Sequence, residues 1–204
     1  MIRAAVSLAL GAALALCASL ALAAVTDPQA DDMSLGRPAA KVTVIEYASV
    51  GCPHCAKWAN EVFPAFKAKY VDTGKVRFVM RELLTGDPTL AAAGFMVARC
   101  AGPDKYFDVV DGVFQHQAEM FAPGASRGDL LAAVARSAGM TDAAFQTCLT
   151  TQANLDALNA RADRHHQDGI DSTPTFFVGD QRLDGEAPLD QLGAAIHTAE
   201  RRRR

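Results

Sequence analysis

The stretch Val42-Thr-Val-Ile-Glu-Tyr47, followed by Cys52-Pro53-His54-Cys55, decides the fold of this chain. The β-branched run predicts a strand over residues 41–48, and apolar side chains recur at about every fourth position from Ala56 onward, as on one face of a helix. The first cysteine should therefore lie at a helix N-terminus, where unpaired backbone N–H groups and the helix dipole stabilise a thiolate. Because the thiolate attacks and leaves in disulfide exchange, the two cysteines predict redox chemistry on the thiols of other proteins.

The four residues of this motif receive different roles. Cys52 is the candidate nucleophile, and Cys55, one turn into the helix, should be buried and should act as the resolving thiol. Pro53 fits the first helical turn, where its missing N–H costs nothing. His54 offers the thiolate a positive charge when protonated and a hydrogen-bond donor when neutral.

Length and charge narrow the class of protein. The chain has 204 residues, half of them hydrophobic, which is enough for one buried domain with room for an inserted subdomain. Its formal net charge is −3, and this mildly acidic balance argues against nucleic acid as a partner. Arg201 to Arg204 form a basic tail, which we interpret as a solvated extension of a helix C-terminus, where cations complement the dipole. Contact of the tail with anionic lipid or an acidic partner is the alternative.

Residues 1–23 have the pattern of a Sec-type signal peptide. Arg3 supplies the positive charge, an apolar stretch runs from Ala4 to Leu20, and Ala21-Leu22-Ala23 fits a small-residue cleavage site. Such a signal predicts export to the periplasm, with cleavage near Ala23. A retained membrane anchor is the alternative, because the apolar run is nearly long enough to span a bilayer.

Cleavage there would remove Cys17 and leave four of the five cysteines. An even number in an exported protein indicates two disulfides, for which four cysteines allow three connectivities. Since Cys52 and Cys55 pair locally, we predict a structural disulfide between Cys100 and Cys148. Two free buried thiols, which pack like small hydrophobic side chains, are the alternative.

The rest of the chain divides into segments with distinct patterns. Residues 24–40 are polar and contain Pro28 and Pro38, so we interpret them as a linker, too short for a separate dimerisation domain, and expect a monomer. Pro64 should kink the helix that begins at Ala56. The expected order is strand, helix and strand, then an all-helical block, then two strands and a closing helix. The expected ranges are 41–48, 56–70 and 75–82, then 88–101, 103–119, 127–137, a short helix capped by Thr141 and 155–166, and finally 175–178, 181–183 and 188–200.

This order resembles the thioredoxin fold with a helical insertion, as in the DsbA-like thiol:disulfide oxidoreductases. Cys52-Pro53-His54-Cys55 matches the active-site tetrapeptide of that family at all four positions, and Glu46 stands where the family has a buried acidic residue. Ser172-Thr-Pro-Thr-Phe-Phe-Val178 looks like the family's cis-proline loop and the strand after it, and Val71-Asp-Thr-Gly-Lys-Val-Arg-Phe78 resembles its helix-to-strand passage.

The resemblance covers about residues 40–200 and implies an α/β, thioredoxin-like fold with an inserted all-helical subdomain. The expected divisions are 41–87 for the first thioredoxin-like part, 88–168 for the helical insertion, and 169–204 for the second part with its basic tail.

The resemblance also implies roles outside the cysteine motif. The peptide bond before Pro174 should be cis and face the disulfide, which leaves the backbone of Thr173 free to pair with an extended substrate segment. The residue before this proline varies between oxidising and isomerising relatives, so Thr173 leaves the reaction direction open. Glu46 should lie beneath the disulfide and exchange a proton with Cys55, because burial raises the pKa of a carboxyl. An exposed position on the strand is the alternative for Glu46.

The sequence therefore predicts a periplasmic thiol:disulfide oxidoreductase that donates a disulfide to exported proteins. The resemblance implies reoxidation by a quinone-linked membrane partner of the DsbB type, and no cofactor is needed. An isomerase or reductase of specific clients is the first alternative, and a non-enzymatic chaperone or metal carrier is the second. We predict no metal site, because His165 and His166 lack the spacing of a recognised zinc motif and a histidine pair on a polar helix is usually solvated.

Overall fold

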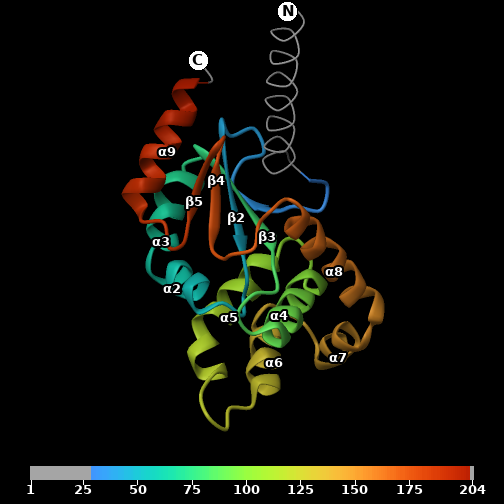
Figure 1. The fold of residues 1–204 in the computed structure, drawn as a ribbon. Coiled ribbons are helices and arrows are strands. Elements are labelled where there is room, and N and C mark those ends of the chain that lie inside the picture. The colour runs from blue at the N-terminus through green and yellow to red at the C-terminus, as the bar shows by residue number, and fades with distance from the viewer. Residues whose placement is uncertain (1–28, 203–204) are drawn as a thin grey trace, which may run out of the picture.

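The computed structural model describes residues 29–202, which form a five-stranded sheet with helices around it (Figure 1). The signal peptide predicted over residues 1–23, its cleavage site, and Arg203 and Arg204 of the basic tail lie outside these residues. Within residues 29–202, no helix is long and apolar enough to cross a bilayer.

The sheet has the strand order β1-β3-β2-β4-β5. Central β2 (Val42–Ala48) pairs in parallel with β3 (Val76–Glu82) and antiparallel with β4 (Thr175–Val178). β1 (Met33–Leu35) and β5 (Gln181–Asp184) add antiparallel strands at the two edges. The chain leaves β2 at Ala48 and reaches the cysteine motif four residues later, so the fold places both cysteines beyond the carboxyl end of its central strand.

Both faces of β2 are buried, and its alternating side chains enter two separate hydrophobic clusters. Val42 and Val44 pack in the main core, whereas Ile45 and Tyr47 pack in a smaller cluster on the other face. Figure 1 shows α9 and α3 on one side of the sheet and α8 on the other. Because successive strand residues point to opposite faces, Glu46 shares the face of Val44 and points into the main core.

The helix after the cysteine motif is broken into three pieces. α2 (Pro53–Glu61) has Val62 as its C-cap residue. α3 (Phe63–Phe66) follows, and a π-helical turn, η1 (Lys67–Val71), completes the segment. The sequence predicted a kinked helix from Ala56 to Tyr70. The helix instead begins three residues earlier, and it breaks just before Pro64 because proline has no N–H and its ring crowds the carbonyl of the preceding turn.

A block of five helices, from α4 to α8, separates β3 from β4, as the predicted helical insertion requires. The Cys100–Cys148 disulfide joins α4 to α7, which confirms the predicted pairing and excludes two free thiols. The Thr141 hydroxyl accepts a hydrogen bond from the Ala144 N–H at 3.2 Å, as the predicted helix cap should. The helices are α4 (Pro88–Cys100), α5 (Tyr106–Met120), α6 (Arg127–Ser137), α7 (Asp142–Thr150) and α8 (Gln152–Gln167), and the chain closes with α9 (Leu189–Arg202).

The segment predicted as a linker, residues 24–40, contains part of the fold. Met33–Leu35 forms the edge strand β1. The Asp32 side chain is 2% exposed and accepts a hydrogen bond at 3.0 Å from Arg81 of β3, and Asp31 accepts one at 2.6 Å from Arg164 of α8. The polar composition and the prolines of this segment did not indicate a strand. Its acidic residues are held by ion pairs, and the strand has only three residues.

Arg201 and Arg202, the described part of the basic tail, are exposed in the last turn of α9, as predicted. Arg202 forms an ion pair with Asp180, in the turn between β4 and β5, and Arg201 donates to the Thr198 hydroxyl at 3.1 Å. Within the described residues, the start of the tail therefore holds α9 against the neighbouring hairpin.

Candidate active site

Cys52 is the N-cap residue of α2 and lies almost completely buried, at 6% exposure. Its sulfur is 3.5 Å from the backbone oxygen of Thr173. The pKa of Cys52 is lowered to about 5, first by a hydrogen bond from the Cys55 thiol, then by the Thr173 side chain and the backbone N–H groups of Cys55 and His54, against the opposing effect of burial. The predicted stabilisation of a thiolate at a helix N-terminus thus has an additional source, the second thiol of the motif.

Cys55, in contrast to Cys52, is stabilised as the protonated thiol. Its side chain is completely buried, and the Ser49 N–H points at its sulfur from 3.5 Å. Burial raises the pKa of Cys55 well above the usual thiol value, and its hydrogen bond to Cys52 and the negative charge of Glu46 act in the same direction. Both cysteines are free thiols here, so the geometry is that of the reduced pair.

Glu46 lies beneath the cysteine motif with 1% of its surface exposed. Neither of its carboxylate oxygens has a hydrogen-bond partner among the described residues. Burial raises the pKa of Glu46 well above its usual value, and the charges of Asp111 and Cys52 raise it further. The alternative of an exposed strand residue is therefore wrong.

His54 points outward rather than over the Cys52 sulfur. Its side chain is 73% exposed, and Nδ1 lies 2.7 Å from an oxygen of Glu186, which also pairs with Lys57 at 2.6 Å. The pKa of His54 is raised, mainly by this hydrogen bond and then by the charge of Cys52. The contact of His54 with the thiolate is made by its backbone N–H, while its ring adds positive charge at longer range.

The Thr173–Pro174 peptide bond is cis, as the resemblance implied. The Thr173 hydroxyl lies 2.5 Å from that of Thr85, in the loop after β3. The Ser49 hydroxyl donates to the backbone oxygen of Thr85 at 2.8 Å, so three segments distant in sequence meet at the cysteines. The carbonyl of Pro174 accepts a hydrogen bond from the Gly185 N–H at 2.8 Å, which fixes the other side of the loop.

The loop after β3 also approaches the cysteine loop at backbone distance. Gly86 has a φ of +75°, and a Cβ built on it would lie 2.2 Å from the Gly51 oxygen. The Asp87 N–H donates to that same oxygen at 3.0 Å. Only a residue without a side chain fits at Gly86, so this glycine allows the two loops to touch.

Gln117 of α5 supports the cysteine loop from below, a role that was not predicted. Its side-chain nitrogen lies 2.8 Å from the Val50 oxygen and 3.2 Å from the Cys52 oxygen, and the residue is 3% exposed. A signal existed in the sequence: Gln117 continues the apolar stripe of Val110, Val113 and Phe114 at helical spacing, and a polar residue in such a stripe needs a buried partner.

His165 does not behave as predicted. It is 3% exposed rather than solvated, its Nδ1 lies 2.9 Å from the backbone oxygen of Glu82, and its ring packs edge-on against Tyr47. Burial lowers the pKa of His165, which favours the neutral ring. Among residues 29–202, no three His, Cys, Asp or Glu side chains are arranged to hold a metal ion.

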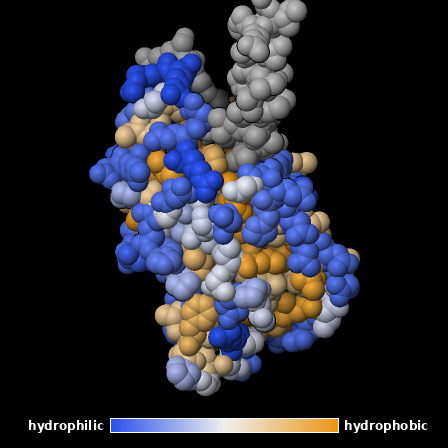
Figure 2. Space-filling model, viewed as in Figure 1, coloured by the Kyte–Doolittle hydropathy of each residue, from blue (hydrophilic) through white to orange (hydrophobic). Residues whose placement is uncertain are grey.

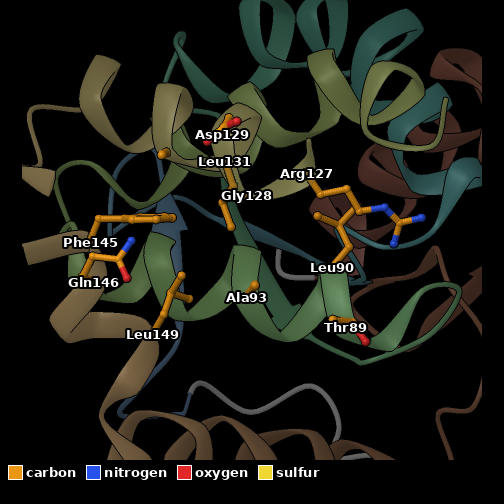
Figure 3. Close-up of a pocket in the computed structure, with 11 residues that line it drawn as sticks. Thr89, Leu90, Ala93, Arg127, Gly128, Asp129, Leu131, Phe145, Gln146 and Leu149 are labelled. Carbon is orange, nitrogen blue, oxygen red and sulfur yellow. The ribbon is translucent and has the colours of Figure 1, made fainter. Parts of the chain in front are cut away.

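A hollow of about 370 Å³ lies in the helical block between α4, α6 and α7 (Figure 3). Figure 3 shows Leu90 and Arg127 at one end and Phe145 and Leu149 at the other. In the view of Figure 2, hydrophobic surface also gathers over the helical block. The lining includes neither cysteine of the motif nor the Thr173–Pro174 loop, so the redox chemistry is not placed there.

Known proteins are similar to this chain in sequence. A family model described as Thioredoxin matches residues 29–198. A Rickettsia typhi protein, provisionally named a protein-disulfide oxidoreductase, is 30% identical over 170 residues, which cover 83% of this chain and 62% of that protein. The chain thus spans less than two thirds of this relative. Disulfide bond formation protein D of Bacillus subtilis is 25% identical over 169 residues, covering 79% of this chain and 74% of that protein.

Solved structures agree with the sequence relatives. α-DsbA1 of Wolbachia pipientis superposes with a TM-score of 0.74 at 26% identity, covering 84% of this chain and 92% of that one. Oxidised BdbD of Bacillus subtilis superposes with a TM-score of 0.72 at 21% identity, covering 82% and 92%, and at that identity it supports the fold alone. Since the family model covers most of the chain and the structure superposes on α-DsbA1, the chain belongs to the thioredoxin family and has the fold of its DsbA-like members.

Proposed function

We propose that this protein is a thiol:disulfide oxidoreductase that donates the Cys52–Cys55 disulfide to exported proteins. The observation that carries this proposal is the contrast between the two thiols: the pKa of Cys52 is about 5, whereas that of Cys55 is raised above the usual value. One sulfur is therefore a good leaving group and the other is best kept protonated. The names of the Rickettsia typhi and Bacillus subtilis relatives support the same chemistry.

The reaction begins when a substrate thiolate attacks the Cys52 sulfur of the oxidised protein. The Cys52–Cys55 bond breaks, a mixed disulfide forms, and the Cys55 sulfur leaves and takes a proton from Glu46. A second substrate thiolate then attacks the substrate sulfur of the mixed disulfide, and Cys52 leaves as a stable thiolate. Two electrons pass from the substrate to the protein. The Thr173 backbone, beside the cysteines, would hold the substrate segment extended.

The stable thiolate also sets the direction of the reaction. Whatever stabilises the reduced form makes the disulfide a stronger oxidant, and a low pKa at the attacked cysteine does this at neutral pH. Pro53 allows the tight helix start that produces the effect, because the first turn needs no N–H from it.

Turnover then requires an oxidant. We assign this task to a quinone-linked membrane protein of the DsbB type, in agreement with a periplasmic location and a monomeric donor that needs no cofactor of its own. The clients are exported proteins with free cysteines.

Three measurements on the protein test this proposal. Alkylation of reduced Cys52 should follow a titration midpoint near pH 5, far below the value of about 8.5 for a free thiol, and the Cys52→Ser variant should lose this reactivity. Equilibration with glutathione should give a potential above about −200 mV, on the oxidising side of glutaredoxins. A strongly reducing potential, near the value of about −270 mV of thioredoxin, would rule out the donor role. Faster reshuffling of a scrambled substrate than oxidation of a reduced one would favour an isomerase.

A further inference from the structure

The buried acid of this site has no direct access to solvent. Glu46 is 1% exposed, and its oxygens have no partner among the described residues. When Glu46 gives its proton to Cys55, the resulting carboxylate must be protonated again before the next cycle. A side chain enclosed in this way needs an intermediate group that reaches both Glu46 and the surface.

An inner cavity lies against Glu46 and is lined otherwise by apolar side chains and by Asp111 of α5. Its volume of about 10 Å³ is close to the minimum that admits one water molecule. A buried water needs two or more polar partners, and the carboxyl groups of Glu46 and Asp111 provide them. The sole tryptophan of the chain, Trp58, lines the same cavity.

An outer groove of about 390 Å³ begins on the other side of Asp111, between α2, α3 and α5. Its lining includes Asn60, Pro64 and Gln115, all of which are exposed, so solvent enters it. Asp111 is the titratable residue that lines both spaces, because Glu46 borders only the inner cavity and Lys67 only the outer groove.

The environment of Asp111 suits a group that gains and loses protons near neutral pH. The pKa of Asp111 is raised to about 6, first by burial and then by the charge of Asp108 on the same helix, against the opposing charge of Lys67 of η1. From the sheet, Asp111 faces Glu46, whose pKa it raises in turn. The residues that α2 and α3 contribute around it, including Asn60 and Phe63, are uncharged.

We propose that Asp111 relays protons between solvent in the outer groove and Glu46, through one water molecule in the inner cavity. This inference rests on the proposed role of Glu46 as the proton donor to Cys55. When the Cys52–Cys55 bond breaks, its electron pair stays on the Cys55 sulfur, which takes the Glu46 proton. Glu46 then takes a proton from the cavity water, the water takes one from Asp111, and Asp111 takes one from solvent. One proton enters for each Cys55 thiol formed, and the path runs in reverse on reoxidation.

The test is a rapid pH jump on the oxidised protein, followed by the fluorescence of Trp58, which shares the inner cavity with Glu46. The Asp111→Asn variant should slow the relaxation by about a hundredfold, the lower end of what a positioned proton donor contributes. Added formate, a small acid that fits the outer groove, should restore the rate. Asp111→Glu, which keeps a carboxyl group, should stay within about threefold of the wild type.

Glu119→Gln is the matched control, because it removes an exposed carboxyl from the same helix, lines neither space and is not among the charges that act on Asp111. It should relax at the wild-type rate. An unchanged rate in Asp111→Asn, or a slow rate that formate does not restore, would overturn the relay. If Glu46→Gln keeps the wild-type relaxation, the signal does not come from Glu46, and the role of Glu46 in the proposed function fails together with the relay. The disulfide-donor role is judged separately by the glutathione equilibrium.

Discussion

The Cys52 and Cys55 sulfurs belong to one tetrapeptide, yet the pKa of the first is lowered to about 5 and that of the second is raised. Both shifts come from where each side chain lies relative to the start of α2. Cys52, at the N-cap, receives hydrogen bonds from the Cys55 thiol and from backbone N–H groups, whereas Cys55 is fully buried and faces the charge of Glu46. The spacing of the motif thus makes Cys52 stable as a thiolate and Cys55 stable as a thiol.

At the same scale, Glu46 should make the stability of the protein depend on pH. The pKa of Glu46 is raised in the folded state above its usual value of 4.5. Above pH 4.5 the folded protein therefore keeps a proton on Glu46 that the unfolded chain has released. The stabilisation is complete below that value and is lost as pH rises toward the folded-state pKa, with a slope of at most about 1.4 kcal/mol per pH unit. Glu46→Gln should remove this slope and become more stable than the wild type at neutral pH.

Urea unfolding of the oxidised protein from acidic to neutral pH measures this effect, because the disulfide removes the two titrating thiols of the motif. Glu61→Gln, which replaces an exposed carboxyl of α2, is the control and should change stability by less than about 0.5 kcal/mol. Parallel pH profiles for Glu46→Gln and the wild type would show that Glu46 is not protonated in the folded state.

At the scale of elements, the cysteine loop is held in place by helix α5 and by the loop after β3. Gln117 of α5 donates to the Val50 and Cys52 oxygens, and Gly86 allows the second loop to approach Gly51. Neither element adjoins the cysteines in sequence. The sequence predicted α2 and its neighbouring strands from local pattern. Contacts between distant residues, such as Gln117 and Cys52 at a separation of 65, are set by packing, which periodicity does not report.

Gln117→Ala should therefore destabilise the protein by about 1–3 kcal/mol, because it leaves two buried carbonyl oxygens without their donor. Since one of these oxygens belongs to Cys52, the variant should also alkylate at Cys52 with an altered titration midpoint. Denaturant unfolding and pH-dependent alkylation measure the two effects. Gln115→Ala, an exposed site on the same helix, should change neither, and equal stability of the two variants would contradict the supporting role of Gln117.

At the scale of the whole molecule, the order of strands and helices could be predicted because each element has a clear period and the motif marks the start of α2. The interpretation of residues 24–40 as a linker was wrong for two reasons. Strand β1 has only three residues, and the partners of the acids that precede it, Arg81 and Arg164, lie far along the chain. His165 was expected on the surface for the same reason: its helix is polar overall, and burial of one position depends on the sheet beneath it. The cysteine pair could be placed from its motif, whereas the positions of Pro174 and the buried Glu46 were implied by the resemblance, since the strand pattern alone also allowed an exposed Glu46.

The disulfide of the helical insertion and the redox site should make separable contributions, the first to stability and the second to the reactivity of Cys52. The Cys100–Cys148 disulfide closes a loop with a sequence separation of 48 residues between α4 and α7. In the chain-entropy description, closing a loop of this length destabilises the unfolded chain, and so stabilises the folded protein, by about 4 kcal/mol.

The double variant Cys100→Ala/Cys148→Ala should lose stability of this order. Its Cys52 alkylation midpoint should stay near pH 5, because the causes of that pKa lie in α2 and the Thr173 loop. Thermal unfolding and alkylation of the double variant, compared with the wild type, measure the two effects. A shift of the Cys52 midpoint toward that of a free thiol would mean that the disulfide between α4 and α7 also helps to position the nucleophile.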